Sequence, residues 1–207
     1  MYGNRRAFLS SCCLSSLGIT AASAGIFNNK AKKICGVKDS YSNNAIFRRG
    51  NWGRMNLRYY ILKRDSDLSS DIWDEEFRLA FDSWADVTPF TFSQVTAGQS
   101  YDIVISAGRK KKESFGRRGG TLAWAQLPSY KNFDGPLLAK FDTAEDWVLP
   151  GSSYGTILRS VAAHEIGHLL GLGHSSDSNA LMYPYINNSL KPKGDDVRKI
   201  QRLYNFN

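Results

Sequence analysis

The chain contains three histidines, His164, His168 and His174, and all of them lie within one eleven-residue segment. On a helix, positions i and i+4 share a face, so His164 and His168 can present their imidazoles to a common point. Gly171 can adopt the left-handed conformation that ends a helix, and the turn would bring His174 to the same point. Three imidazoles with an open fourth position are typical of a catalytic zinc site, whereas structural zinc sites are usually closed by four protein ligands.

Glu165 directly follows the first histidine. On a helix its carboxylate would reach beside the metal without binding it, where it can take a proton from an attacking water and pass it to a leaving amine. The alternative interpretation is a core helix with three structural histidines. The fixed spacing of the motif, which uses every histidine in the chain, favours the catalytic site.

The composition is that of an ordinary globular protein, with 42% hydrophobic and 22% charged residues among 207. This length suits one domain with its own hydrophobic core. No apolar run approaches the roughly 18 residues that a membrane-spanning helix needs. The formal net charge is +8, which makes a polyanion a candidate partner on charge alone.

Apolar residues recur at helical spacing after Ser69, at Trp73, Phe77, Ala80, Trp84 and Val87. This pattern predicts an amphipathic helix that begins at a serine cap and ends near Pro89. Strand-like patterns occur at 55–62, 90–95, 101–106, 121–127 and 137–141, and further helical patterns at about 156–170 and 195–204. Strands and helices do not alternate regularly, which favours an α+β fold.

Residues 1–24 resemble a bacterial twin-arginine export signal. They contain Arg5 and Arg6, no acidic residue, a mildly apolar stretch and a small-residue cleavage site at 22–24. The alternative is a basic tail without a targeting role. Residues 25–45 are polar and are predicted to form a short pro-segment or linker. We therefore expect an exported protein, periplasmic or extracellular, in which Cys35 is the single cysteine left after cleavage.

The histidine motif resembles that of the metzincin metallopeptidases, and Ser175 after the last histidine is typical of the matrix metallopeptidases, or matrixins. Other segments resemble the matrixin Met-turn, last helix, first helix-to-strand junction and cleft-edge strand, namely 180–184, 195–204, 87–92 and 121–123. The resemblance covers about residues 46–207. It implies a catalytic domain with a twisted, mostly parallel five-stranded sheet and three helices.

The resemblance implies a monomeric zinc-dependent endopeptidase that acts on protein or peptide substrates, with no nucleic acid as partner. It places Met182 beneath the zinc ligands as an apolar floor. It also implies a set of substrate-binding residues along the edge strand and around the main specificity pocket: Leu122, Ala123, Ser160, Pro184, Tyr185 and Ile186. An extended substrate would add to the edge of the sheet.

The segment 34–39 resembles the matrixin cysteine switch, in which a propeptide thiolate occupies the fourth zinc position. Cys35 is therefore a candidate zinc ligand of a latent form. Lys33, Ile34 and Lys38 depart from the family motif, where proline, arginine and proline are usual. The alternative is a cysteine without a latching role.

Two further metal sites of the family are altered. Trp124 and Lys140 occupy positions where two histidines of a structural zinc site are usual, so we do not expect a second zinc. Asp142 and Glu145 match a calcium-binding pair, but Gly116 replaces the aspartate that would join them. Calcium binding and ordinary surface charge both remain open for this pair.

Rival functions follow from the same residues. A metal-binding but inert module would require an idle Glu165. A polyanion-binding protein would require clustered basic charge, for which the loop 109–118 is the candidate, although a solvated basic loop explains it as well. Within the metzincins, an astacin-like or adamalysin-like protein is disfavoured by Ser175 and the single cysteine of the mature chain.

Overall fold

The computed structural model describes residues 33–37, 50–109 and 115–206. The predicted signal at 1–24 and most of the segment 25–45 lie outside these residues. The helices are α1 (Ser70–Ala85), α2 (Leu158–Leu169) and α3 (Gly194–Tyr204). The strands are β1 (Ile34–Cys35), β2 (Asn51–Trp52), β3 (Asn56–Lys63), β4 (Thr91–Gln94), β5 (Ile103–Ala107), β6 (Thr121–Ala125), β7 (Lys131–Phe133), β8 (Leu137–Phe141), β9 (Trp147–Val148) and β10 (Thr156–Ile157). In this part of the chain no helix is long and apolar enough to cross a bilayer.

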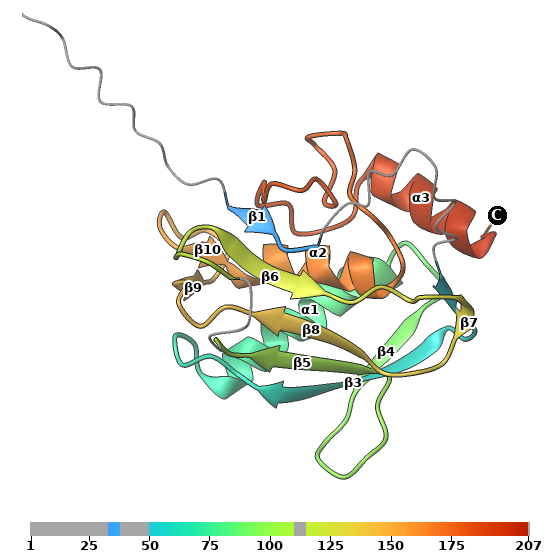
Figure 1. The fold of residues 1–207 in the computed structure, drawn as a ribbon, viewed down its shortest axis with the longest axis horizontal. Coiled ribbons are helices and arrows are strands. Elements are labelled where there is room, and N and C mark those ends of the chain that lie inside the picture. Colours follow the sequence, from blue (N-terminus) through green and yellow to red (C-terminus); the bar gives the residue numbers. More distant parts are fainter. Residues whose placement is uncertain (1–32, 38–49, 110–114, 207) are drawn as a thin grey trace, which may run out of the picture. The chain divides into compact units, whose positions relative to one another are not determined.

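The main sheet has six strands within the described ranges, in the order β1-β6-β8-β5-β3-β4 (Figure 1). β6 runs antiparallel to β8, and all other neighbours are parallel. The α+β class is confirmed. The five predicted strands correspond to β3, β4, β5, β6 and β8, and the sixth is β1, which comes from the predicted pro-segment and extends the sheet beyond β6.

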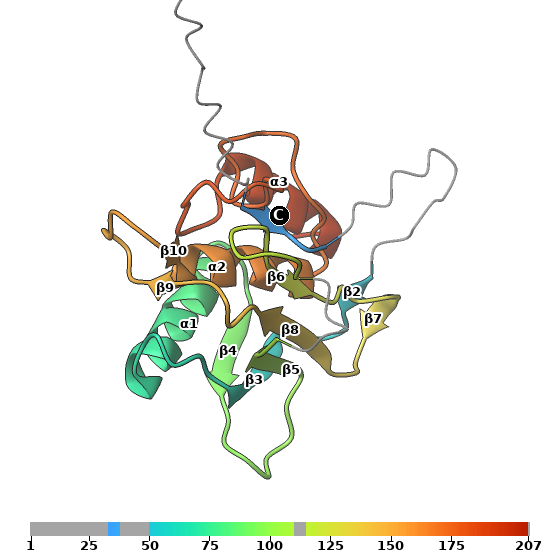
Figure 2. The same cartoon turned by 60° about the vertical axis from the view of Figure 1, so that its left-hand side comes forward.

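Helix α1 buries the face that its sequence predicts. Trp73, Phe77, Ala80 and Trp84 are each at most 1% exposed, and the Ser69 hydroxyl accepts a hydrogen bond from the first turn. Helices α1 and α2 lie together on one face of the sheet (Figure 2). Their apolar side chains therefore form the core between the helices and the sheet.

Two polar contacts fasten α2 to α1. The Arg159 guanidinium donates two hydrogen bonds to the Glu76 carboxylate, at 3.0 and 2.6 Å, and Glu76 is buried. The Trp84 indole donates to the carbonyl of Ala163 at 2.8 Å. Because α2 carries the first two histidines, these contacts fix the position of the candidate site relative to the core.

Candidate metal centre

Helix α2 and the turn after it bring the three histidines together. His164 and His168 lie one turn apart on α2, and Gly171 has a φ of +95° just after the helix ends. The Leu172 amide donates back to the Gly167 carbonyl at 2.9 Å. This is the left-handed helix end that the sequence predicts, and it returns the chain so that the His168 and His174 Nε2 atoms lie 3.3 Å apart.

Backbone carbonyls orient two of the rings. His164 Nδ1 lies 2.7 Å from the Leu181 carbonyl oxygen, and His168 Nδ1 lies 2.7 Å from that of Leu172. A carbonyl can only accept, so both Nδ1 atoms carry the proton and both Nε2 atoms present a lone pair. Hydrogen bonds of this kind, from the ring nitrogen that does not face the metal to a carbonyl, usually orient metal-binding histidines.

Cys35 completes a cluster of four metal-binding side chains. Its Sγ lies 3.3 Å from His168 Nε2, and one ligand atom from each of Cys35, His164, His168 and His174 lies within 4.8 Å of all the others. Zinc accepts nitrogen and thiolate sulfur at about 2.0–2.3 Å in tetrahedral geometry. Such a geometry places ligand atoms roughly 3–4 Å apart, so the donor set fits zinc.

Glu165 is completely buried beside this cluster. Burial raises the pKa of its carboxyl to about 8, and a hydrogen bond with the Cys35 side chain partly opposes the shift. A carboxyl with a pKa near neutrality can both accept and release a proton, as a general acid–base group must.

The cleft edge holds an extended segment on both sides. Strand β1 runs parallel to β6, where the amides of Ile34 and Gly36 donate to the carbonyls of Gly120 and Ala123 at 3.0 and 2.7 Å. On its other side, the Cys35 amide donates to the Pro184 carbonyl and the Ile186 amide donates to the Lys33 carbonyl, both at 3.1 Å. Residues 33–36 therefore lie in the groove between β6 and the segment 184–186.

Comparison with known proteins places this architecture in a family. The family described as Matrixin matches residues 51–205. The chain belongs to the matrixin family. It is 36% identical to macrophage metalloelastase of Rattus norvegicus over 179 residues, 38% to matrix metalloproteinase-18 of Xenopus laevis over 180, and 37% to interstitial collagenase of Equus caballus over 180. These alignments cover 82–84% of this chain but only 36–37% of each relative.

Hydrogen bonds from the Met-turn of this matrixin to the last helix, α3, hold the turn in place. Met182 is fully buried, and its Sδ packs so closely on Gly167 that a Cβ there would lie 2.3 Å from it. The Asp196 carboxylate accepts from the amides of Leu181 and Met182 at 2.8 and 3.1 Å. The sequence motif at 195–197 indicated a helix start but not this role, since the partners lie on a distant loop.

The residues proposed for substrate binding lie on three segments of this matrixin. Ala123 offers its carbonyl to β1, whereas the Leu122 carbonyl accepts from the amide of Asp142, the residue just after β8. Ser160 is buried in α2. Pro184, Tyr185 and Ile186 border the groove on its far side, where Tyr185 pairs with Ile34.

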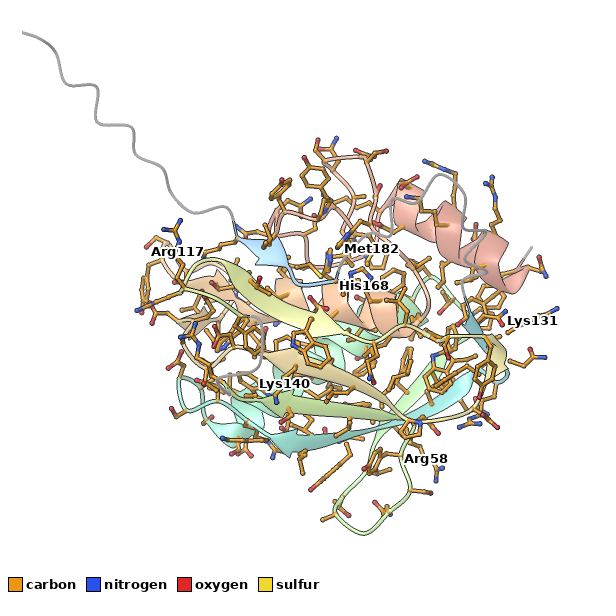
Figure 3. The ribbon with its side chains drawn as sticks, viewed as in Figure 1. Arg58, Arg117, Lys131, Lys140, His168 and Met182 are labelled. Atoms are coloured by element: carbon orange, nitrogen blue, oxygen red, sulfur yellow. The ribbon has the colours of Figure 1, made fainter. Side chains whose placement is uncertain are left out.

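The altered metal positions lie along β6 and β8. Trp124 and Lys140 are direct cross-strand partners, and Figure 3 labels Lys140 on the sheet, away from His168. Asp142 and Glu145 are both buried, so their interpretation as ordinary surface charge is wrong. Within the described ranges, the cluster of Cys35 with the three histidines is the one group of three or more such side chains close enough to share an ion.

Gly171→Ala is expected to destabilise this matrixin. A side chain at positive φ costs about 1–2 kcal/mol, and a Cβ here would also lie 2.6 Å from the Gly50 carbonyl oxygen. The matched control is Gly151→Ala, where φ is +92° and nothing lies within 4 Å. Thermal unfolding should show a larger loss for Gly171→Ala; equal losses would contradict the steric argument.

Proposed function

We propose that this matrixin is a zinc-dependent endopeptidase that hydrolyses peptide bonds in proteins. The observation that carries the proposal is the convergence of three imidazole Nε2 atoms next to a buried glutamate, in a groove that already holds an extended stretch of chain. The relatives named as a metalloelastase, a metalloproteinase and a collagenase support the same activity.

His164, His168 and His174 would hold the zinc, with the Leu181 and Leu172 carbonyls fixing two of the rings. When bound, zinc supplies Lewis-acid polarisation and lowers the pKa of a bound water. Glu165 accepts the proton of the attacking water on its carboxylate and then donates it to the nitrogen of the leaving amine. Its burial keeps bulk water from competing for that proton.

The substrate takes the place of β1. An extended peptide that lies along β6 can donate to the carbonyls of Gly120 and Ala123, as residues 34 and 36 do. The opposite side of the groove supplies Pro184, Tyr185 and Ile186 as the wall of the specificity pocket, with Ser160 at its base. Main-chain pairing provides affinity, and the pocket distinguishes among side chains.

The same groove makes the uncleaved chain latent. Cys35 Sγ, 3.3 Å from His168 Nε2, would close the position that a catalytic water needs. The Lys33 ammonium donates to the Gly155 carbonyl and so anchors the segment two residues before the cysteine. Removal of residues 25–45 then opens the groove of the domain at 46–207. We propose that residues 1–24 are the export signal. The mature chain would then act as a monomer in the periplasm or outside the cell.

The activity can be tested with the full chain carrying Cys35→Ala and a quenched generic matrixin peptide. Cleavage should stop on addition of a zinc chelator and return on addition of zinc but not of magnesium. About one zinc per chain should be measured by elemental analysis. A chain that binds no zinc, or one that cleaves equally well with the chelator, would overturn the proposal.

A further inference from the structure

The buried pair Asp142 and Glu145 is where matrixins are expected to bind calcium, so its surroundings decide whether a cation is needed. Asp142 is 0% exposed and Glu145 is 4% exposed. Buried carboxylates require a charge or hydrogen-bond partner, because an uncompensated buried charge costs several kcal/mol. The chain itself supplies a partner for three of the four oxygens of this pair.

Arg109 supplies the positive charge. Its Nε lies 3.0 Å from Asp142 Oδ1. The same guanidinium donates to the carbonyl of Gly116, the residue that replaces the expected third aspartate. The Arg109 side chain thus connects Asp142 to Gly116, the two positions that a calcium ion would otherwise bridge. Arg109 and Gly116 both belong to the loop that leads from β5 to β6.

Glu145 is satisfied by the other end of the same loop. Its Oε1 accepts from the Gly119 amide at 2.6 Å, and its Oε2 lies 3.5 Å from the Thr156 hydroxyl. Next to it, Arg118 pairs with Asp146 at the surface. Asp142 Oδ1 also accepts from the Ala144 amide at 3.0 Å, so three of the four carboxylate oxygens have a partner in the chain. Asp142 Oδ2 is buried and has no hydrogen-bond partner among the described residues, so the charge of this carboxylate is balanced by Arg109 alone.

We propose that Arg109 replaces calcium in this matrixin, so that the described ends of the loop after β5, residues 108–109 and 115–120, are held without a metal ion. Calcium needs six to eight oxygen ligands at about 2.3–2.6 Å. Asp142 and Glu145 do not form part of any group of three metal-binding side chains in the described residues. A guanidinium also cannot share that space with a divalent cation, because their charges repel. This inference concerns stability and does not depend on peptidase activity.

The test is thermal unfolding of the zinc-loaded full chain, with zinc held constant and calcium or magnesium chloride added to about 10 mM, tenfold above the weakest Kd of extracellular calcium sites. The wild-type midpoint should shift by less than about 1 °C between the two salts. Binding at that saturation would raise it by roughly 3–5 °C. A rise of that size in the wild type would overturn the proposal.

Arg109→Ala should lower the midpoint and create a calcium response. The variant frees Asp142 and the Gly116 carbonyl for an ion, so calcium, but not magnesium, should restore several degrees. The matched control is Arg78→Ala, which breaks exposed pairs with Glu75 and Asp82 and leaves two carboxylates behind. It should show no calcium response, and a response of Arg109→Ala no larger than this control would contradict the replacement.

If Arg109→Ala does not fold, a calorimetric titration of the wild-type chain with calcium still tests whether the chain binds this ion. No binding heat up to millimolar calcium is expected. A saturable signal at about one calcium per chain would show that the ion binds although Arg109 is present, and the proposal would fail.

Discussion

Glu165→Ala should reduce kcat/KM for a peptide substrate by about 10²–10⁴-fold, the contribution typical of a general acid–base group. The carboxylate is fully buried, and the cluster of metal-binding side chains within the described residues contains no carboxylate of its own. The measurement is best made in the Cys35→Ala background, where the groove is not closed by the thiol. Zinc content should be unchanged, because Glu165 is not a ligand.

The unfolding midpoint distinguishes a loss of catalysis in Glu165→Ala from a loss of folded protein. Burial penalises the ionised form of Glu165, as its raised pKa indicates, so its removal should leave the unfolding midpoint unchanged or higher. Glu75→Ala is the control, since Glu75 lies on the exposed side of α1 and should retain full activity. Activity of Glu165→Ala within about tenfold of its parent would show that the glutamate is not the general base.

Cys35→Ala should raise the activity of the uncleaved chain by about tenfold or more, because each 1.4 kcal/mol of lost latch free energy is a factor of ten in the open population. The thiol contacts His168 Nε2 directly, and it is the strongest zinc-binding group that the pro-segment contributes. The assay compares full-length proteins on the same quenched peptide. Lys33→Ala should activate less, since it removes an anchor and leaves the thiol.

Val37→Ala provides the control for this effect. It changes the same segment but keeps the thiol and its own amide, which lies 3.4 Å from Cys35 Sγ. The control should remain as latent as the wild type. Equal activity of wild type and Cys35→Ala would mean that the cysteine is incidental and that β1 alone blocks the groove.

The long elements were predictable because their side chains repeat with the period of the structure. The apolar positions of α1 recur every three or four residues, and β8 matches the predicted range 137–141. The two-residue strand β2 was not predicted, because it exists only by pairing with β7, far along the chain. A strand of two residues carries no periodicity that a sequence could reveal.

The candidate site likewise has features that the sequence predicted and features that it did not. The residue types and spacing of His164, His168 and His174 indicated a shared ion, since i and i+4 lie on one helix face whatever the surrounding fold. The support of the Met-turn by Asp196 was not predicted, because hydrogen bonds to the amides of Leu181 and Met182 depend on how α3 docks.

The sequence alone determined the α+β class and the set of candidate metal ligands with the glutamate beside them, since these follow from local spacing and periodicity. Only the tertiary structure decided which carbonyls orient the rings, that β1 fills the groove next to β6, and that Arg109 meets Asp142. The physical reason is that these contacts join segments far apart in the chain. Their partners are chosen by packing of the whole domain and not by neighbouring residues.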